Sequence, residues 1–405
     1  MNAAAAPNRE TSAASVADVF LVFLKLGLTS FGGPVAHLGY FHAEIVRRRR
    51  WLDETEYADL VALCQFLPGP ASSQVAFALG QRRAGIFGAF AASAGFTLPS
   101  AVLMIAFAYG VSAVPDLRTA GWLHGLKLAA VAVVAQAVWV MGRKLCPDLP
   151  RLIFALTAAA TVILVPHAIT QVGVIAAGAI AGWIYFHGKL PAQPVAVEDS
   201  IARPHAWAIA ALATCAALLV LLPVAAKITA NPNVRVFDSF YRSGALVFGG
   251  GHVVLPLLRA EVVPVGWITD DRFLAGYGLA QAMPGPLFTF AAYLGTAIHG
   301  EPRAWLGGVL GLFAIFLPAW LLIGGALPFW HTLRGKSGIQ TALRGANAAV
   351  VGVLLAALYN PVWKESVTQP RDVMAVVLAF AALQTGRVAP WIVVALMAAA
   401  GNWIL

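Results

Sequence analysis

Four basic side chains stand within or at the start of long apolar stretches, where a charge is costly unless it has a partner. Lys25 lies in the apolar run 19–31, Arg242 stands in a matching stretch, and Lys127 and Arg344 each begin an apolar run. A charge at the centre of a bilayer costs about 2.5–3.5 kcal/mol on insertion scales. These residue types predict electrostatic binding of an anion. For Lys127 and Arg344, near the ends of their segments, snorkelling of the side chain to the interface explains the position equally well.

Two short motifs close to the cations predict breaks in the helices that carry them. Phe-Gly-Gly occurs at 31–33 and 248–250, and Pro-Gly-Pro occurs at 68–70 and 284–286. Glycine permits the turn, and proline is tolerated at the first position of a new helix, whose unpaired N–H groups attract anions. The predicted hinge residues are Pro34, Pro68, Gly69, Pro70, Pro284, Gly285 and Pro286, and the predicted backbone contacts to the anion are at Gly32, Gly33, Gly249 and Gly250.

A simpler interpretation is that these prolines only kink packed helices. One motif alone would favour that view, but four breaks at matched positions favour a shared binding site near the middle of the membrane. Polar side chains beside the second motif agree with this hypothesis. The residues predicted to bind the anion, or to satisfy the broken backbone, are Gln65, Ser72, Ser73, Gln281 and Thr289.

Titratable residues follow the first break in each half of the chain. Glu44 and Glu261 are candidates for proton coupling, although pairing of Glu44 with Arg47 or Arg48 is the simpler interpretation. His37 and His252 lie just past the Phe-Gly-Gly motifs and could titrate near neutral pH, but a structural histidine is at least as plausible.

The composition predicts that lipid is the solvent for most of the chain. Of 405 residues, 60% are hydrophobic and 11% are charged, against about 45–50% and 25% in soluble domains. The net charge of +9 comes from short loops between apolar segments, which indicates membrane topology rather than nucleic-acid binding. The three cysteines stand alone, so no metal or cofactor site is predicted. The predicted fold is an all-α polytopic membrane protein.

The chain contains two copies of one unit. Aligning 25–44 with 242–261 without gaps matches both Phe-Gly-Gly motifs, Lys25 with Arg242 and Glu44 with Glu261, and the Pro-Gly-Pro motifs follow in the same order. The predicted divisions are an N-terminal repeat at 1–187, a polar linker with one extra helix at 188–235, and a C-terminal repeat at 236–405. One added crossing makes the second copy enter from the opposite side, so the repeats are expected to be inverted.

Charge distribution predicts the sidedness. The run of arginines at 47–50 places its loop in the cytoplasm, and the balanced charges at 259–272 suit an external loop. This puts the N-terminus in the cytoplasm and the C-terminus in the periplasm. If 59–80 folds back at Pro-Gly-Pro as a re-entrant hairpin, Arg82 and Arg83 also stay inside. The favoured arrangement is two re-entrant or broken helices and four spans per copy, and counting each hairpin as a crossing gives 13 segments.

The motifs resemble a known family. Residues 31–39 and 65–74 are similar to the N-half signatures of the chromate ion transporter (CHR) family, and 248–256 and 281–286 resemble its C-half signatures. Both halves match, which is typical of the long-chain, two-domain form. The resemblance implies efflux of chromate across a bacterial inner membrane, with sulfate as a structural analogue, whereas the residues alone indicate only an anion.

The resemblance favours a secondary transporter over an enzyme. Moving a divalent anion out of a negative interior gains about 4.6 kcal/mol at 100 mV, so export needs no further coupling, although proton coupling stays open. The alternatives are an oxyanion importer and an anion channel on the same scaffold. No redox motif or nucleotide-binding motif supports a reductase or an ATP-driven pump. The expected partners are the oxyanion and membrane lipid, and homodimer formation is left open.

Overall fold

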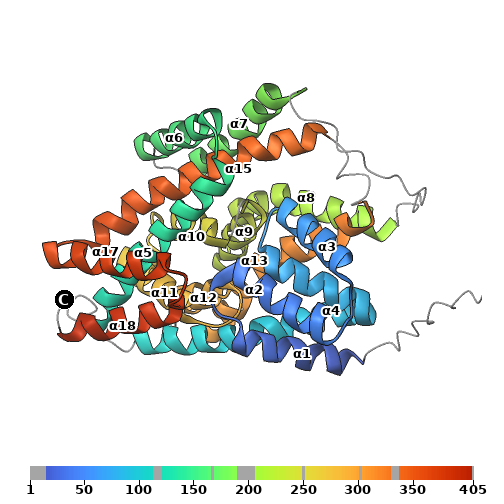
Figure 1. Cartoon of the computed structure of the whole chain (residues 1–405), viewed down its shortest axis with the longest axis horizontal. Helices are drawn as coiled ribbons and strands as arrows, with labels where there is room; N and C mark the ends of the chain where they lie inside the picture. Colours follow the sequence, from blue (N-terminus) through green and yellow to red (C-terminus); the bar gives the residue numbers. More distant parts are fainter. Residues whose placement is uncertain are drawn as a thin grey trace, which may run out of the picture.

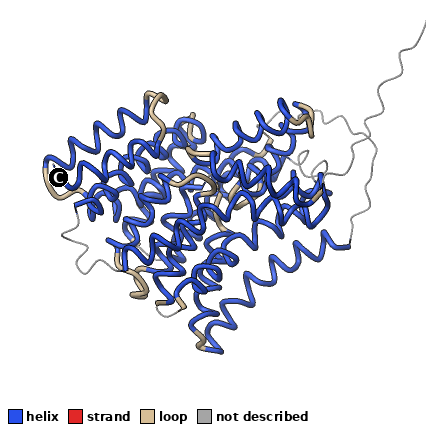
Figure 2. Tube along the Cα trace, turned by 90° about the horizontal axis from the view of Figure 1, so that it is seen from below, coloured by secondary structure: helices blue, strands red, loops and turns tan. Residues whose placement is uncertain are grey.

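The structure, a computed structural model, describes residues 15–112, 121–165, 168–188, 206–248, 251–300, 303–329 and 337–403. Every regular element in these ranges is helical, and no strand occurs in them (Figure 2). Six of the described helices are long and apolar enough to cross a membrane. The predicted fold class, an all-α polytopic membrane protein, is confirmed.

The chain passes twice through a similar series of helices (Figure 1). The first pass comprises α1 (Val16–Thr29), α2 (Gly33–Phe41), the π-helix η1 (His42–Arg48), α3 (Glu54–Phe66), α4 (Ala71–Ser112), α5 (Gly121–Leu145), α6 (Leu149–Leu164) and α7 (Ala168–Phe186). Helix α8 (Ala206–Thr229) follows it. The second pass comprises α9 (Pro232–Ala245), η2 (Gly251–Val253), α10 (Val254–Val262), α11 (Asp270–Ala282), η3 (Leu287–Thr289), α12 (Phe290–His299), α13 (Ala304–Ala326), η4 (Leu327–Phe329), α15 (Ser337–Ala357), η5 (Leu358–Trp363), α16 (Lys364–Ser366), α17 (Pro370–Gln384) and α18 (Pro390–Trp403).

Helix α4 consists of two legs that fold back on each other. Its backbone leaves the helical region at Ala84 and Gly85, where Gly85 has a φ of +65°. Eight residues of straight helix would separate Gly80 from Gly88 by about 12 Å, yet a Cβ on Gly80 would lie 2.2 Å from the Gly88 carbonyl oxygen. In the second pass, α12 and α13 form the matching hairpin.

The second leg of α4 and its counterpart α13 run in opposite directions. Near one end of this contact, Trp320 Nε1 donates to Ser93 Oγ at 3.1 Å. Near the other end, the main-chain N–H of Trp305 donates to Tyr109 Oη at 3.2 Å. Rising numbers on α4 therefore meet falling numbers on α13. Inverted repeats require this relation between equivalent helices, while their sidedness in a membrane stays a prediction.

The two passes exchange their last helices. Helices α6 and α7 of the first pass pack along α15 of the second, and α17 and α18 of the second pass pack along α5 of the first (Figure 1). Glycines allow the closest approaches: a Cβ on Gly345 would lie 2.0 Å from the Gly178 carbonyl oxygen, and one on Gly125 would lie 2.0 Å from that of Met397. Each pass is thus completed by helices from the other.

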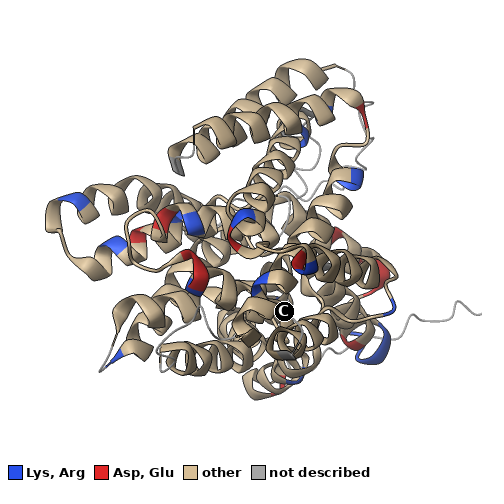
Figure 3. Cartoon of the chain, turned by 90° about the vertical axis from the view of Figure 1, so that its left-hand side faces the viewer, with Lys and Arg blue, Asp and Glu red and all other residues tan. Residues whose placement is uncertain are grey.

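Charged residues are sparse over the helical body (Figure 3). Large apolar side chains are instead exposed on outer surfaces, as on α8 and at Phe87, which is 75% exposed. Such surfaces suit contact with lipid chains. The predicted polar loop after residue 188 falls mostly outside the described residues, as do Gly249 and Gly250.

Candidate functional site

The helix breaks of the two passes meet at one junction through a reciprocal pair of hydrogen bonds. The main-chain N–H of Gly69, in the first Pro-Gly-Pro, donates to the Val247 carbonyl at 2.7 Å. The N–H of Gly285, in the second Pro-Gly-Pro, donates to the Ser30 carbonyl at 2.8 Å. Ser30 and Val247 each stand directly before a Phe-Gly-Gly motif. Each Pro-Gly-Pro of one pass therefore binds the Phe-Gly-Gly region of the other.

Glycine is required at this junction for both conformation and space. Gly32, Gly33, Gly69 and Gly285 have φ values of +95°, +76°, +116° and +89°, a region that other residues rarely adopt. A Cβ on Gly285 would also lie 2.9 Å from Ser100 Oγ. The preceding helix ends before each of these motifs, and a new helix begins at its last glycine or shortly after it.

Prolines stand at the starts of the new helices, as the sequence predicted. Pro34 lies in the first turn of α2, Pro70 directly precedes α4, and Pro286 caps η3. In this arrangement the missing N–H of proline costs little, because the first N–H groups of a helix have no acceptor within it.

A buried polar cluster lies on the first-pass side of the junction. His37 Nδ1 and Ser72 Oγ are 3.3 Å apart, and Gln74 Nε2 donates to the Pro68 carbonyl at 2.8 Å. Ser30 Oγ, Ser73 Oγ and Gln74 Oε1 are buried and have no hydrogen-bond partner among the described residues. An unsatisfied buried polar group costs about 1–3 kcal/mol, so three together indicate a place where water or a polar ligand binds.

The second-pass side of the junction is mostly apolar. Phe288 and Phe290 occupy the positions of Ser72 and Gln74, and Thr289, aligned with Ser73, uses its hydroxyl to donate to the Pro286 carbonyl at 2.8 Å. The polar cluster therefore belongs to one repeat. Ser30 and Gln74 were not among the predicted binding residues. Their positions beside Phe-Gly-Gly and Pro-Gly-Pro could have indicated that they belong to the cluster.

Other predicted polar residues have partners outside this cluster or are exposed. His252 Nδ1 lies 3.0 Å from the Tyr277 hydroxyl, and Gln281 stands beside the same hydroxyl. Gln65 is exposed. Anion binding by these residues stays a prediction.

The matched cation and carboxylate of the first pass form an ion pair. Lys25 Nζ, on α1, lies 3.5 Å from Glu44 Oε2, on η1. Arg48 and Arg49 also bind Glu44, at 3.0 and 2.8 Å. The Lys25 side chain is 54% exposed, whereas that of Glu44 is 10% exposed. Glu44 thus pairs with three cations, including the predicted Arg48.

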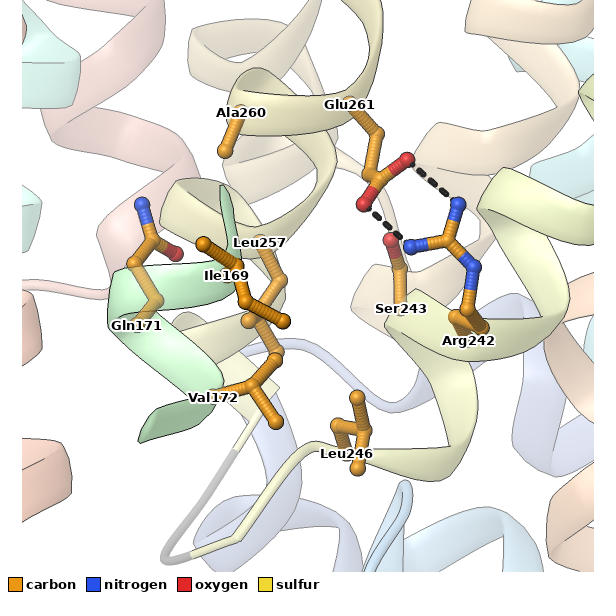
Figure 4. Close-up of a pocket in the computed structure, with 9 residues that line it drawn as sticks. All are labelled: Ile169, Gln171, Val172, Arg242, Ser243, Leu246, Leu257, Ala260 and Glu261. Atoms are coloured by element: carbon orange, nitrogen blue, oxygen red, sulfur yellow. Dashed lines mark hydrogen bonds and ion pairs between the residues drawn. The ribbon is translucent and has the colours of Figure 1, made fainter. Parts of the chain in front are cut away.

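In the matched pair of the second pass the cation is more buried than Lys25, and the balance of charge is reversed. Arg242, on α9, donates to Glu261 of α10 at 2.6 and 2.8 Å and to Asp238 of its own helix at 2.8 and 3.0 Å. Figure 4 shows the guanidinium facing the Glu261 carboxylate beside a cavity of about 230 Å³. One cation here serves two carboxylates, whereas in the first pass three cations serve one.

The second predicted cation pair behaves differently in the two passes. Lys127 Nζ binds Asp271 of the other pass at 2.8 Å. Arg344 has no ion pair with a described residue within 4 Å, although its charge acts on Asp148 in the loop between α5 and α6. Hydrogen bonds from Arg151 hold the pKa of that Asp148 carboxyl below its usual range, with the nearby Arg344 charge adding to the effect.

One tryptophan brings both arginine clusters of the first pass together. The guanidinium carbons of Arg49 and Arg83 lie 5.6 and 5.3 Å from the ring centre of Trp51. The start of α3 and the end of the first leg of α4 therefore lie next to each other. A re-entrant hairpin would have this geometry, while its placement with both clusters on one side of the membrane stays a prediction.

Comparisons with known proteins agree with the duplicated architecture. A family model described as "Chromate transporter" matches residues 17–183 and again 234–402. The chain is 29% identical to the "Chromate transport protein" of Pseudomonas aeruginosa, over 84% of this chain and 79% of that one. It is 26% identical to the "Chromate transport protein" of Cupriavidus metallidurans, over 89% and 86% of the two chains.

A shorter relative matches about one repeat. The "Uncharacterized transporter YwrB" of Bacillus subtilis is 33% identical over 42% of this chain and 87% of its own length. No solved structure is significantly similar to this chain.

Proposed function

Because the chain belongs to the chromate transporter family, we propose that it exports chromate, a sulfate-like divalent oxyanion, across a bacterial inner membrane. The observation that carries the proposal is the junction at which Gly69 and Gly285 bind across the repeats beside buried, unpaired polar atoms. Broken helices that meet at one point between repeats, with polar groups unsatisfied, are the usual setting of a substrate site in secondary transporters. The oxyanion would supply the missing partners.

The matched ion pairs provide the charge that an anion site needs. Lys25 and Arg242 each bind a carboxylate that follows the same break in its own repeat. A carboxylate resembles an oxyanion in charge and in its hydrogen-bonding oxygens. In this proposal the pairs hold the cationic groups in place until the anion arrives.

The membrane potential is the proposed driving force. Export of a dianion from a negative interior is favoured by about 4.6 kcal/mol at 100 mV, whereas import would require at least two accompanying cations. Proton coupling through Glu44, Glu261, His37 or His252 is a further part of the proposal. The proposed orientation places the arginines around Trp51 in the cytoplasm, where they would attract anions before transport.

The test is chromate flux through purified protein in liposomes with an imposed potassium-diffusion potential. We expect saturable chromate movement toward the positive side, faster at larger potential, with sulfate as a competitor and protein-free liposomes as the control. Flux that does not respond to the potential would rule out potential-driven export. Single-channel currents would instead favour the channel alternative, and a requirement for a pH gradient would establish proton coupling.

A further inference from the structure

Two cavities border the ion pair of Arg242 and Glu261. The smaller cavity, of about 230 Å³, lies between α7, α9 and α10 (Figure 4). The larger, of about 580 Å³, opens beside α8, α9 and α10. Arg242 and Glu261 line both cavities.

The two carboxylates on Arg242 have different attachments. Asp238 lies one turn before Arg242 on the same helix, and its side chain is 7% exposed. Glu261 comes from α10, is 15% exposed, and is the partner that links α10 to α9. Asp238 can therefore keep the guanidinium in place while Glu261 leaves. Arg242 has one fixed carboxylate and one exchangeable carboxylate.

We infer that a tetrahedral oxyanion replaces Glu261 on Arg242, and that this exchange opens a passage between the two cavities. The inference rests on the proposed function and assigns the substrate a second binding position, at the ion pair of the second pass, in addition to the junction. The planar guanidinium presents parallel N–H donors that match two oxygens of an oxyanion as well as they match a carboxylate. The smaller cavity holds several water volumes of about 30 Å³ each, which is enough for such an ion.

A buried amide on the opposite wall supports the site. Gln171, on α7, belongs to the lining of the smaller cavity, on the side opposite Arg242 in Figure 4. Its side chain is nearly buried, and Oε1 has no hydrogen-bond partner among the described residues. An amide can present either its carbonyl or its NH₂ group to the cavity. The carbonyl can accept a hydrogen bond from water when the anion is absent, and the NH₂ group can donate one to a bound oxyanion.

The equivalent pair of the first pass is not built for the same exchange. Glu44 is held by Arg48 and Arg49 as well as by Lys25. Displacing Glu44 would break three contacts with cations, whereas displacing Glu261 breaks contact with one. The exchange is therefore assigned to Arg242 alone.

The experiment measures binding of radiolabelled inorganic sulfate to the purified full-length chain in detergent. Glu261→Gln removes the internal competitor, so we expect sulfate to bind about tenfold more tightly than in the wild type. Arg242→Lys keeps the positive charge but loses the parallel N–H donors of the guanidinium. In that background, Glu261→Gln should change the affinity for sulfate less than twofold. Glu261→Asp, which retains the charge on a shorter arm, should give a smaller increase and serves if the glutamine variant does not fold.

Asp270→Asn is the matched control. Asp270 pairs with Arg259 through two hydrogen bonds of 2.7 and 3.0 Å, and neither residue lines either cavity. Sulfate affinity should stay within twofold of the wild type in this variant. Wild-type or weaker sulfate binding in both Glu261 variants, or an equal increase in the control, would overturn the exchange. Failure of the wild type to move chromate in liposomes would overturn the proposed function instead.

Discussion

Replacing Gly285 by alanine should disrupt the junction between the repeats by a predictable amount. The backbone at Gly285 has a φ of +89°, which costs other residues roughly 1–2 kcal/mol. The new Cβ would lie 2.9 Å from Ser100 Oγ and 3.1 Å from the Phe96 carbonyl oxygen, and overpacking of this kind adds about 1–3 kcal/mol. We therefore expect Gly285→Ala to lose roughly 2–5 kcal/mol of stability and to impair transport.

Gly300→Ala separates the two contributions. Gly300 also has a positive φ, of +69°, but a Cβ there would meet no atom within 4 Å. This variant should lose only the conformational term, which is about 1–3 kcal/mol in the glycine-only region where ψ is 172°. The measurement is unfolding of both variants in the same detergent, followed by chromate flux at matched protein amounts. Equal losses of stability and flux in the two variants would refute the close packing described for the junction.

Three further predictions concern the polar cluster, the hairpin and the exchanged helices. Ser73→Ala should leave stability unchanged but reduce chromate flux, whereas Thr289→Ala should cost about 1 kcal/mol of stability by losing a satisfied hydrogen bond. Unfolding in detergent and flux assays distinguish the two variants, and equal losses of stability would contradict the different roles assigned to these hydroxyls. Single cysteines introduced at Arg50 and Arg82 in a cysteine-free background should react with a membrane-impermeant reagent from the same side, and labelling from opposite sides would exclude the re-entrant hairpin. A chain cut within 189–205 should give active protein only when both pieces are made together, as shown by co-purification and flux; activity from either piece alone would disprove mutual completion.

The sequence predicted the helix breaks because their causes are local. Glycines at 32, 33, 69 and 285 adopt positive φ values, and the prolines stand at helix starts. Such conformational preferences act over a few residues, so a single chain reveals them. The duplicated motifs also indicated that the breaks belong together, although only the structure identifies the reciprocal hydrogen bonds.

The partners of the cations were harder to predict, because packing across the whole chain selects them. Lys127 binds Asp271, which lies 144 positions away in the other pass. Glu44 was expected to pair with a neighbouring arginine, and it does so with Arg48, but Lys25 also reaches it from the helix before the break. The alignment of the repeats matched Lys25 with Arg242 and Glu44 with Glu261. It could not show that the cation and the carboxylate of each repeat lie within ion-pair distance.

The exchange of terminal helices has a consequence for synthesis of the protein. During translation, α6 and α7 are made well before α15, and α5 precedes α17 and α18 by more than half of the chain. The glycines of α5 and α7 therefore stay in the bilayer without these packing partners until the later helices have been synthesised. The first repeat would be exposed to membrane quality control until the last helix is released. Slow elongation in the second half should consequently lower the yield of the first half as well.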